Sequence, residues 1–393
     1  MSNIKYPYSR PNINSSDVEA VIRVLHSQFL TQGPVVKSFE QEIEKKFSVK
    51  SAIICNSGTA ALHSVYKSLG LNKDNGLITT PITFLATANA ARMCNAPVYF
   101  ADVDPHTGLL TSETLEKAFE RVNFKVKVVT VVHLGGHICD LESISKIVKK
   151  KKCFLVEDAC HAIGAKYYSN KKKGFYIGAC KYSIASTFSF HAIKNITMGE
   201  GGCVTTNNKK LANDIRLNIS HGMIKDSKKM LNAPRNSPWY YEMNDIGWNY
   251  RASEIACALG LNQFKRLDKI ISKRTKIADY YKMFLEDNVN IKLPKYYTNA
   301  DNSGWHLYQL SIDFKSIEKS KGDFINYLKK SSIGSQVHYI PLNYQPYYKK
   351  FSNIKNLKGA IQFYNNTISI PMHTNLKKSC ISYISKVIND YFK

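Results

Sequence analysis

Two residues of this chain that each follow an apolar run are suited to covalent chemistry. Lys194 lies five residues after Ser189, beyond an aromatic and β-branched run, and the glycine-rich residues 199–202 follow it. Asp158 lies at the end of a predicted buried strand at 153–157. A lysine amine that forms a Schiff base, with a carboxylate that pairs with a pyridinium nitrogen, is the arrangement that pyridoxal phosphate (PLP) enzymes need. The pattern predicts PLP chemistry, with Lys194 and Asp158 as catalytic residues.

Each of these residues also has an ordinary alternative role. Lys194 could be one more surface lysine, and Asp158 could cap a helix. The apolar setting of Lys194 favours the catalytic role, because burial lowers the pKa of an amine and leaves it nucleophilic. Strand alternation favours Asp158 over its neighbour Glu157. His161 could stand beside a bound ring and Ser189 could hold a phosphate, or both could be structural.

The composition is that of an ordinary globular protein. The chain has 393 residues, of which 44% are hydrophobic, and this length predicts two lobes. It contains no apolar run of membrane-spanning length and no signal-peptide pattern, so we expect a cytoplasmic protein without a membrane partner. Nine scattered cysteines without a Cys-x-x-Cys pair indicate reduced thiols.

The net charge of +25 raises the alternative of a DNA-binding or regulatory protein. Lysine dominates the basic residues, arginine is sparse, and no nucleic-acid-binding signature is present. We therefore expect a solvated lysine-rich surface and no nucleic-acid partner. His133 and His137, with Cys139 and Asp140, resemble a metal cluster, but the two intervening glycines argue against a shared helical face, and no metal is predicted.

The remaining pattern alternates between strands and helices, which predicts an α/β fold with helices on both faces of a sheet. Strands are predicted at 51–55, 77–80, 97–101, 127–133, 153–157, 184–190 and 203–206. Helices are predicted at 15–28, 37–47, from about 60 to 69, 85–94, 112–120, 141–151 and 208–217. The loops at 56–59, 158–161 and 189–194 all follow strands, so we expect them to converge on one crevice.

A long helix is predicted from residue 252 to about 284, leading to a smaller α+β lobe. In this lobe strands are predicted at 305–313, 335–339 and 367–370, with helices near 321–330 and 376–391. The predicted division is a large PLP-binding domain at 15–255 and a small C-terminal domain at 256–393, with residues 1–14 packing nearby.

As a set, these motifs resemble the DegT-like family of PLP-dependent sugar-nucleotide aminotransferases. The resemblance covers nearly the whole chain, with motifs at 29–34, 56–63, 80–89, 156–164, 188–194, 199–202, 247–251 and 336–341. They include Asn-Ser-Gly-Thr at 56–59, Ser-Phe-His-Ala-Ile-Lys at 189–194 and Gly-Trp-Asn-Tyr-Arg at 247–251. The resemblance implies fold type I, the fold of aspartate aminotransferase, with a mostly parallel mixed sheet.

The resemblance also implies roles for single residues. Lys194 would carry PLP as an internal aldimine, with a pyridoxamine phosphate form in turnover, and Asp158 would pair with the ring nitrogen. The other implied cofactor contacts are Gly58, Thr59 and Ser189 at the phosphate, Phe84 stacked on the ring, His161 near the phenolic oxygen, and Asn249 reaching the phosphate of a neighbouring subunit. The implied sugar-nucleotide contacts are Tyr8, Thr31, Arg251, His338 and Tyr339.

Within the family, the motifs are most similar to members that transfer an amino group from L-glutamate to the 4-keto carbon of a UDP-linked 4-keto-6-deoxy-N-acetyl-hexosamine, as homodimers with shared sites. The product of the donor would be 2-oxoglutarate. Asn195 and Met198 depart from the usual residues of the family. Other bacillosamine- or perosamine-type 4-aminotransferases and 3-aminotransferases remain alternatives, whereas a 3-dehydratase is disfavoured because Lys194 is present.

Overall fold

A seven-stranded sheet forms the centre of the protein. The structure, a computed structural model, describes residues 4–168, 174–232, 234, 237–294, 303–350 and 357–393. The strands are β1 (Ser51–Cys55), β2 (Gly76–Thr79), β3 (Val98–Phe100), β4 (Val126–Val132), β5 (Phe154–Asp158), β8 (Ala185–Ser189) and β9 (Gly202–Thr206). Their order is β1-β9-β8-β5-β4-β2-β3; β9 is antiparallel to both neighbours and the other pairs are parallel. The predicted α/β fold with a mostly parallel sheet is confirmed.

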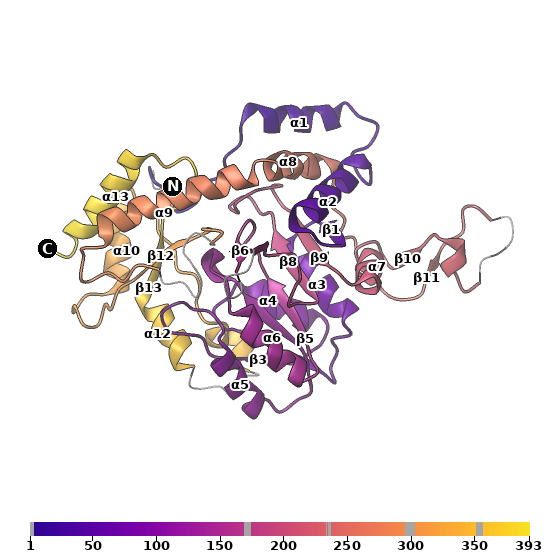
Figure 1. The fold of residues 1–393 in the computed structure, drawn as a ribbon, viewed down its shortest axis with the longest axis horizontal. Helices are drawn as coiled ribbons and strands as arrows, with labels where there is room; N and C mark the ends of the chain where they lie inside the picture. Colours follow the sequence, from indigo (N-terminus) through magenta and orange to yellow (C-terminus); the bar gives the residue numbers. More distant parts are fainter. Residues whose placement is uncertain (1–3, 169–173, 233, 235–236, 295–302, 351–356) are drawn as a thin grey trace.

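Helices cover both faces of this sheet (Figure 1). One face packs on α3 (Gly58–Ser68), α4 (Leu85–Met93) and α7 (Lys209–Asn218). The other packs on α2 (Pro34–Phe47), α5 (Ser112–Arg121) and α6 (Leu141–Lys150). Side-chain alternation decides the face, so Val128 and Val156 point to the first set and Val129 and Leu155 to the second. The strands are therefore apolar on both sides, as a covered parallel sheet requires.

Four helices of this domain begin at a capping residue. Ser57, Thr111, Asp140 and Asn208 precede α3, α5, α6 and α7, and each side-chain oxygen accepts a backbone N–H of the first turn. The predicted helices at 112–120, 141–151 and 208–217 are confirmed within a residue or two at each end. Among the described residues, no helix is both long and apolar enough to cross a bilayer.

The predicted long helix after residue 252 is broken into two. It consists of α8 (Glu254–Phe264) and α9 (Leu267–Leu285), and the break falls at Lys265 and Arg266. Neither glycine nor proline lies at this break, and the apolar pattern continues across it, so the sequence pattern does not reveal the break. The prediction of one continuous helix was wrong, and a tertiary ion pair of Arg266, described below, lies at the break.

A second apolar core lies in the C-terminal part. Here α9 packs on β12 (Tyr308–Ser311), β13 (Thr367–Ile370), α10 (Lys321–Lys330) and α13 (Lys378–Asp390). The expected strand at 335–339 is reduced to one bridge between Gln336 and Ser369, and the sequence did not predict α11 (Pro346–Lys349) or α12 (Lys358–Asn366). Because α8 packs on α1 (Ser15–Leu25) and α2, the packing argues for a boundary inside α9, and the division at residue 256 stays a prediction.

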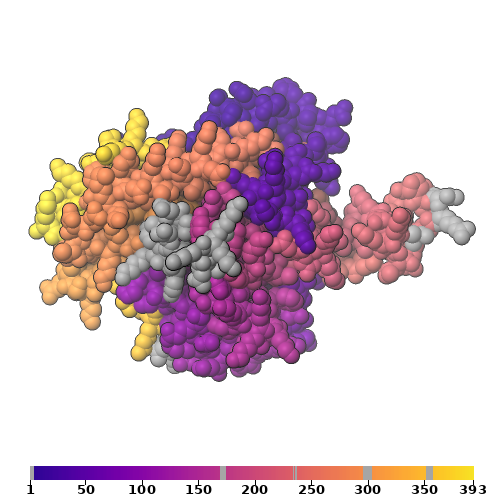
Figure 2. Space-filling model, in the orientation of Figure 1, coloured from indigo at the N-terminus to yellow at the C-terminus, as the bar shows by residue number. Residues whose placement is uncertain are grey.

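Two hairpins also escaped the sequence patterns. The short strands β6 (Lys166–Tyr167) and β7 (Phe175–Tyr176) pair with each other. The pair β10 (Met223–Ile224) and β11 (Glu242–Met243) belongs to an arm, formed by residues 223–232 and 237–246, that projects from the body of the protein (Figures 1 and 2). Its strands contain only two residues each, too few for a periodic signal.

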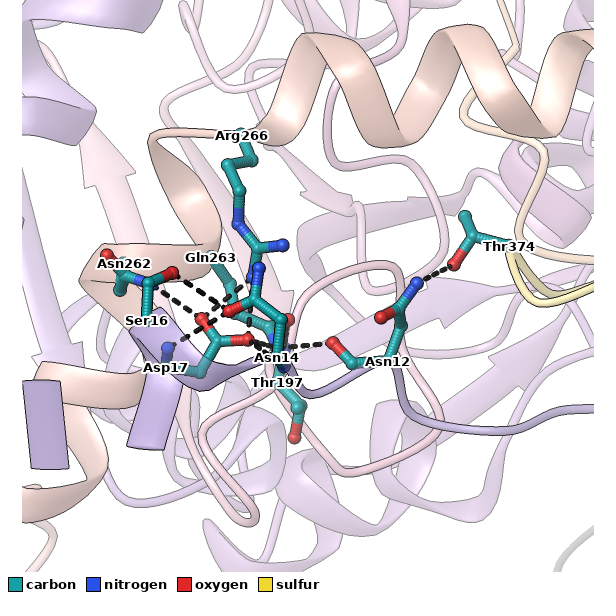
Figure 3. Close-up of polar contacts among 9 residues, drawn as sticks. All are labelled: Asn12, Asn14, Ser16, Asp17, Thr197, Asn262, Gln263, Arg266 and Thr374. Carbon is teal, nitrogen blue, oxygen red and sulfur yellow. Dashed lines mark hydrogen bonds and ion pairs between the residues drawn. The ribbon is translucent and has the colours of Figure 1, made fainter. Parts of the chain in front are cut away.

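A buried carboxylate joins the N-terminal segment to the break between α8 and α9 (Figure 3). Asp17 is fully buried, and one terminal nitrogen of Arg266 donates to both its oxygens at 2.7 and 2.6 Å. Asn262 and Gln263 donate to the same carboxylate at 2.7 and 3.3 Å. Gln263 also accepts from the backbone N–H of Thr197 at 3.1 Å, three residues beyond Lys194. The network therefore extends from α1 to the loop that carries Lys194.

This network yields a prediction about stability. Replacing Asp17 with alanine should destabilise the fold by about 3 kcal/mol, because it leaves buried donors without an acceptor and Arg266 without a counter-ion. Denaturant unfolding followed by circular dichroism measures the effect. As a control, Lys210→Ala removes an exposed ion pair with Asp214 and should leave the unfolding midpoint nearly unchanged. Equal midpoints for the two variants would contradict a structural role for Asp17.

Candidate active site

A cavity of about 660 Å³ lies at the carboxyl ends of the central strands. Val132 and Asp158, the last residues of β4 and β5, and Ser189, the last of β8, all line it. The first turns of α3 and α4 close one side, and residues 336–340 from the C-terminal part close another. The three loops that the sequence predicted to converge do meet here, because parallel strands deliver their carboxyl ends to one edge of a sheet.

Asp158 is buried at the end of β5, and its carboxylate is already oriented. The Thr87 hydroxyl donates to Asp158 Oδ2 at 2.6 Å, and the backbone N–H of Cys160 donates to Oδ1 at 3.2 Å. Since Thr87 uses its proton on Asp158, Thr83 is the donor in the 2.7 Å contact between the two threonines. No helix begins after Asp158, so the capping alternative is wrong. Glu157 points to the opposite face, where it bonds to His133 and Ser183.

Lys194 lies on a turn after β8 and is half-buried in the cavity wall. Burial lowers the pKa of its amine, while Cys160 and Asp158 partly offset that shift. The turn is held from both sides: the Ser9 hydroxyl donates to the Ile193 carbonyl at 3.0 Å, and the Asn195 amide donates to the Gly304 carbonyl. The lysine therefore combines a fixed backbone with an amine that is more readily neutral than an exposed one.

An anion site lies beside the lysine. Gly58 and Thr59 begin α3, where unpaired N–H groups and the helix dipole favour a phosphate. Ser189 faces this turn so closely that a Cβ on Gly58 would lie 2.9 Å from the Ser189 Cβ. A Cβ on Gly202 would likewise lie 2.2 Å from the Ser57 carbonyl oxygen. Glycine at both positions lets the turn pack closely on β8 and β9 and keeps the amides of Gly58 and Thr59 at the cavity wall. This cradle of N–H groups fits the phosphate of PLP.

Aromatic residues line the mouth of the cavity. Phe84 is 57% exposed although it is a large apolar side chain, and its ring lies 6.1 Å from the ring of Tyr339. An exposed phenylalanine at the mouth of this cavity is suited to covering a flat ring. Phe84, the lysine, the carboxylate and the phosphate cradle together form a set of residues that fits PLP.

The cavity contains most of the residues that the sequence proposed for the site. Those that line it are Tyr8, Gly58, Thr59, Phe84, Asp158, His161, Ser189, Lys194, His338 and Tyr339. Thr31, Asn249 and Arg251 do not line it. Thr31 instead bridges to Ser253, and Asn249 pairs with Ser220 and accepts from the Asn56 side chain at 3.2 Å. Asn249 therefore lies next to the residue that precedes the phosphate turn, and all three residues lie outside the cavity lining of their own chain.

The sequence missed several residues that shape the site. Thr87 orients Asp158, Ser57 caps α3, and Cys160 places its thiol, whose pKa burial raises well above the usual range, in the cavity wall. Thr87 could have been noticed inside the motif at 80–89, but nothing in the sequence shows which threonine faces the aspartate. The two departures from the usual motif, Asn195 and Met198, do not line the cavity.

Comparison with known proteins gives consistent matches over the whole chain. The DegT/DnrJ/EryC1/StrS aminotransferase family matches residues 11–389. A UDP-4-amino-4,6-dideoxy-N-acetyl-beta-L-altrosamine transaminase from Campylobacter jejuni is 36% identical over 98% of this chain and 99% of its own. The spore coat polysaccharide biosynthesis protein SpsC of Bacillus subtilis is 34% identical over 98% of this chain and 97% of its own.

Solved structures agree. Helicobacter pylori PseC, an aminotransferase involved in the biosynthesis of pseudoaminic acid, superposes with a TM-score of 0.87 at 33% identity, covering 98% of this chain and 99% of its own. The PMP-form of a putative sugar aminotransferase from Streptococcus pneumoniae gives 0.88 at 26% identity, covering 98% of this chain and all of its own. These structures confirm the predicted fold type I. The chain belongs to the DegT/DnrJ/EryC1/StrS aminotransferase family.

Proposed function

We propose that this aminotransferase uses PLP to move an amino group from L-glutamate to the 4-keto carbon of a UDP-linked 4-keto-6-deoxy-N-acetyl-hexosamine. The product would be UDP-4-amino-4,6-dideoxy-N-acetyl-β-L-altrosamine, an intermediate of pseudaminic acid synthesis. The observation that carries the proposal is one cavity that holds Lys194, the buried Asp158 and a glycine-lined anion cradle. Similarity over the full chain to transaminases of that name supports the choice of sugar.

The residues present divide the work. The amides of Gly58 and Thr59 and the Ser189 hydroxyl would bind the phosphate, Phe84 would cover one side of the ring, and Asp158 would hold its nitrogen. When bound, PLP supplies an electron sink that stabilises negative charge on the carbon next to the transferred nitrogen.

Lys194 then has two tasks. Its amine holds the cofactor, and once released it carries a proton to and from the reacting carbon. The burial that lowers its pKa serves both, because each task needs a neutral amine. Asp158 is aimed at the cavity by Thr87, so its negative charge is directed at the ring and not spread over alternative orientations.

We further propose that the working form is a homodimer in which Asn249 reaches the cofactor phosphate of the partner subunit. Thr31 and Arg251 would reach the partner's sugar nucleotide in the same way. Arg251 has a buried Nε for which the described residues provide no acceptor, and the described lining of the cavity includes no arginine. A cavity that must bind a diphosphate and a dicarboxylate therefore lacks its guanidinium until a second copy is present.

Exposed apolar surface supports the second copy. On α1, Val18, Ile22 and Leu25 are 49, 44 and 55% exposed at helical spacing. On the arm, Leu231 and Trp239 are each 76% exposed. Apolar surface of this extent on a helix and a projecting arm is typical of a subunit interface. We propose that the second copy covers both.

The thiols support a reducing compartment. All nine cysteines are free thiols, and most of them are buried. We propose a cytoplasmic location.

The Lys194→Ala variant tests the catalytic assignment. We expect product formation from L-glutamate and the UDP-4-keto-6-deoxy sugar to fall by more than about 100-fold, because the variant has no amine to carry the proton. Nuclear magnetic resonance of the sugar product measures it and reports the position and configuration of the new amine. Lys209→Ala, on the exposed start of α7, is the matched control and should keep full activity. Full turnover without Lys194 would contradict the catalytic assignment. If the wild-type protein aminated only a different sugar, the proposed altrosamine product would be wrong.

Subunit complementation tests the shared site. Lys194→Ala and the double variant Asn249→Ala, Arg251→Ala should each be nearly inactive alone. When they are co-expressed with different tags, each mixed dimer contains one intact cavity of its two, so purified mixed dimers should have about half of the wild-type activity. Activity of tag-purified mixed dimers measures this. If Asn249 and Arg251 served their own cavity, every mixed dimer would be inactive.

A further inference from the structure

His161 makes two hydrogen bonds that fix the position of its ring proton. The backbone N–H of Gly135 donates to His161 Nδ1 at 3.2 Å. A backbone N–H can only donate, so Nδ1 is an acceptor and carries no proton. The other nitrogen, Nε2, lies 3.1 Å from the hydroxyl oxygen of Tyr339.

The ring is also neutral and cannot turn freely. His161 is 6% exposed, and burial together with Lys194 and His338 lowers its pKa well below the usual range. The ring of His306 packs against it with centroids 4.4 Å apart. A neutral imidazole has one ring proton, so with Nδ1 bare the proton is on Nε2 and is donated to Tyr339.

Tyr339 therefore uses its oxygen lone pair on His161 and keeps its own proton for another acceptor. Burial raises the pKa of its hydroxyl, with Asp158 and Cys160 adding to the shift, so the O–H stays intact. No second hydrogen bond to this hydroxyl is present within the described ranges of the chain. Tyr339 lines the cavity beside Phe84, so the free proton lies close to where a substrate would bind.

We propose that Tyr339 donates a hydrogen bond to the carbonyl oxygen of the keto substrate, and that His161 is a positioning residue that acts through Tyr339. The proposal rests on the proposed aminotransferase function and adds to it. It also differs from the expectation that His161 contacts the phenolic oxygen of PLP, because both ring nitrogens of His161 already have partners within the protein.

The chemistry of such a donor is direct. A carbonyl carbon becomes more electrophilic when a fixed donor binds its oxygen, and negative charge that develops on that oxygen strengthens the bond. Gly135 donates to His161 and His161 donates to Tyr339, so the tyrosine proton is left to be donated to a group outside this chain of hydrogen bonds. Polarisation along the chain strengthens that last hydrogen bond. This arrangement needs no change in the protonation state of any of the three groups.

A double-mutant cycle tests the coupling. With PLP-loaded protein first converted by L-glutamate to the pyridoxamine phosphate form and freed of excess glutamate, Tyr339→Phe should slow the half-reaction with the keto sugar by about 100-fold, the typical effect of losing one such donor. His161→Leu should slow it in the same direction by about 10-fold, and adding it to Tyr339→Phe should change the rate by less than about twofold. Tyr176→Phe, a partly exposed tyrosine outside the cavity that bonds to Asp268, is the control and should react normally. If the double variant were slowed by the product of the two single effects, the claim that His161 acts through Tyr339 would be overturned.

Two readouts without turnover complete the test. The visible absorption band of PLP-loaded protein, and its change with pH, should be the same in His161→Leu and wild type; a shift would mean that His161 contacts the cofactor and would overturn the proposal. In cofactor-free protein labelled with ¹⁵N-histidine, the His161 signal should show a proton on Nε2, and a proton on Nδ1 would also overturn it. If wild type binds no PLP, the proposed function fails, whereas the ¹⁵N result still tests the hydrogen-bond chain.

Discussion

The register of three neighbouring strands is the constraint on which the site depends. Val132 of β4, Asp158 of β5 and Thr187 of β8 lie side by side in the sheet, which places the loops after them at one edge. A shift by one residue would turn Asp158 to the opposite face and bring Glu157 to the cavity. Apolar packing on both faces fixes this register, so the hydrophobic core and the position of the catalytic carboxylate have the same cause.

The lysine depends on contacts that are distant in sequence. Its turn is held by Ser9 on one side and, through Thr197, by Gln263 on the other. Gln263 is in turn bound to the buried Asp17, whose ion pair with Arg266 lies where α8 ends and α9 begins. The helix break, the N-terminal segment and the lysine turn therefore form one connected unit. Such a support keeps an amine in a half-buried position where its pKa is lowered without leaving the backbone free to move.

Local patterns could predict the parts of the fold that local forces decide. The strands and most helices follow from apolar periodicity and capping residues, and Asp158 and Lys194 follow from their place after strands. The break at Arg266, the arm and the role of Thr87 depend on partners far along the chain, which periodicity cannot show. The same limit applies to Thr31, Asn249 and Arg251: the motif included them, but only the fold places them outside their own cavity. The hydrogen bonds of His161 likewise required coordinates.

The most direct test of the central claim is the visible absorption spectrum of the PLP-loaded protein during sequential addition of both substrates. If one cavity serves both halves of the reaction, L-glutamate should remove the band of the bound cofactor and the UDP-4-keto-6-deoxy sugar should restore it. If glutamate removes the band but this sugar does not restore it, the aminotransferase activity would be supported and the assigned sugar contradicted. A protein that shows no band with PLP would contradict the whole account of the site.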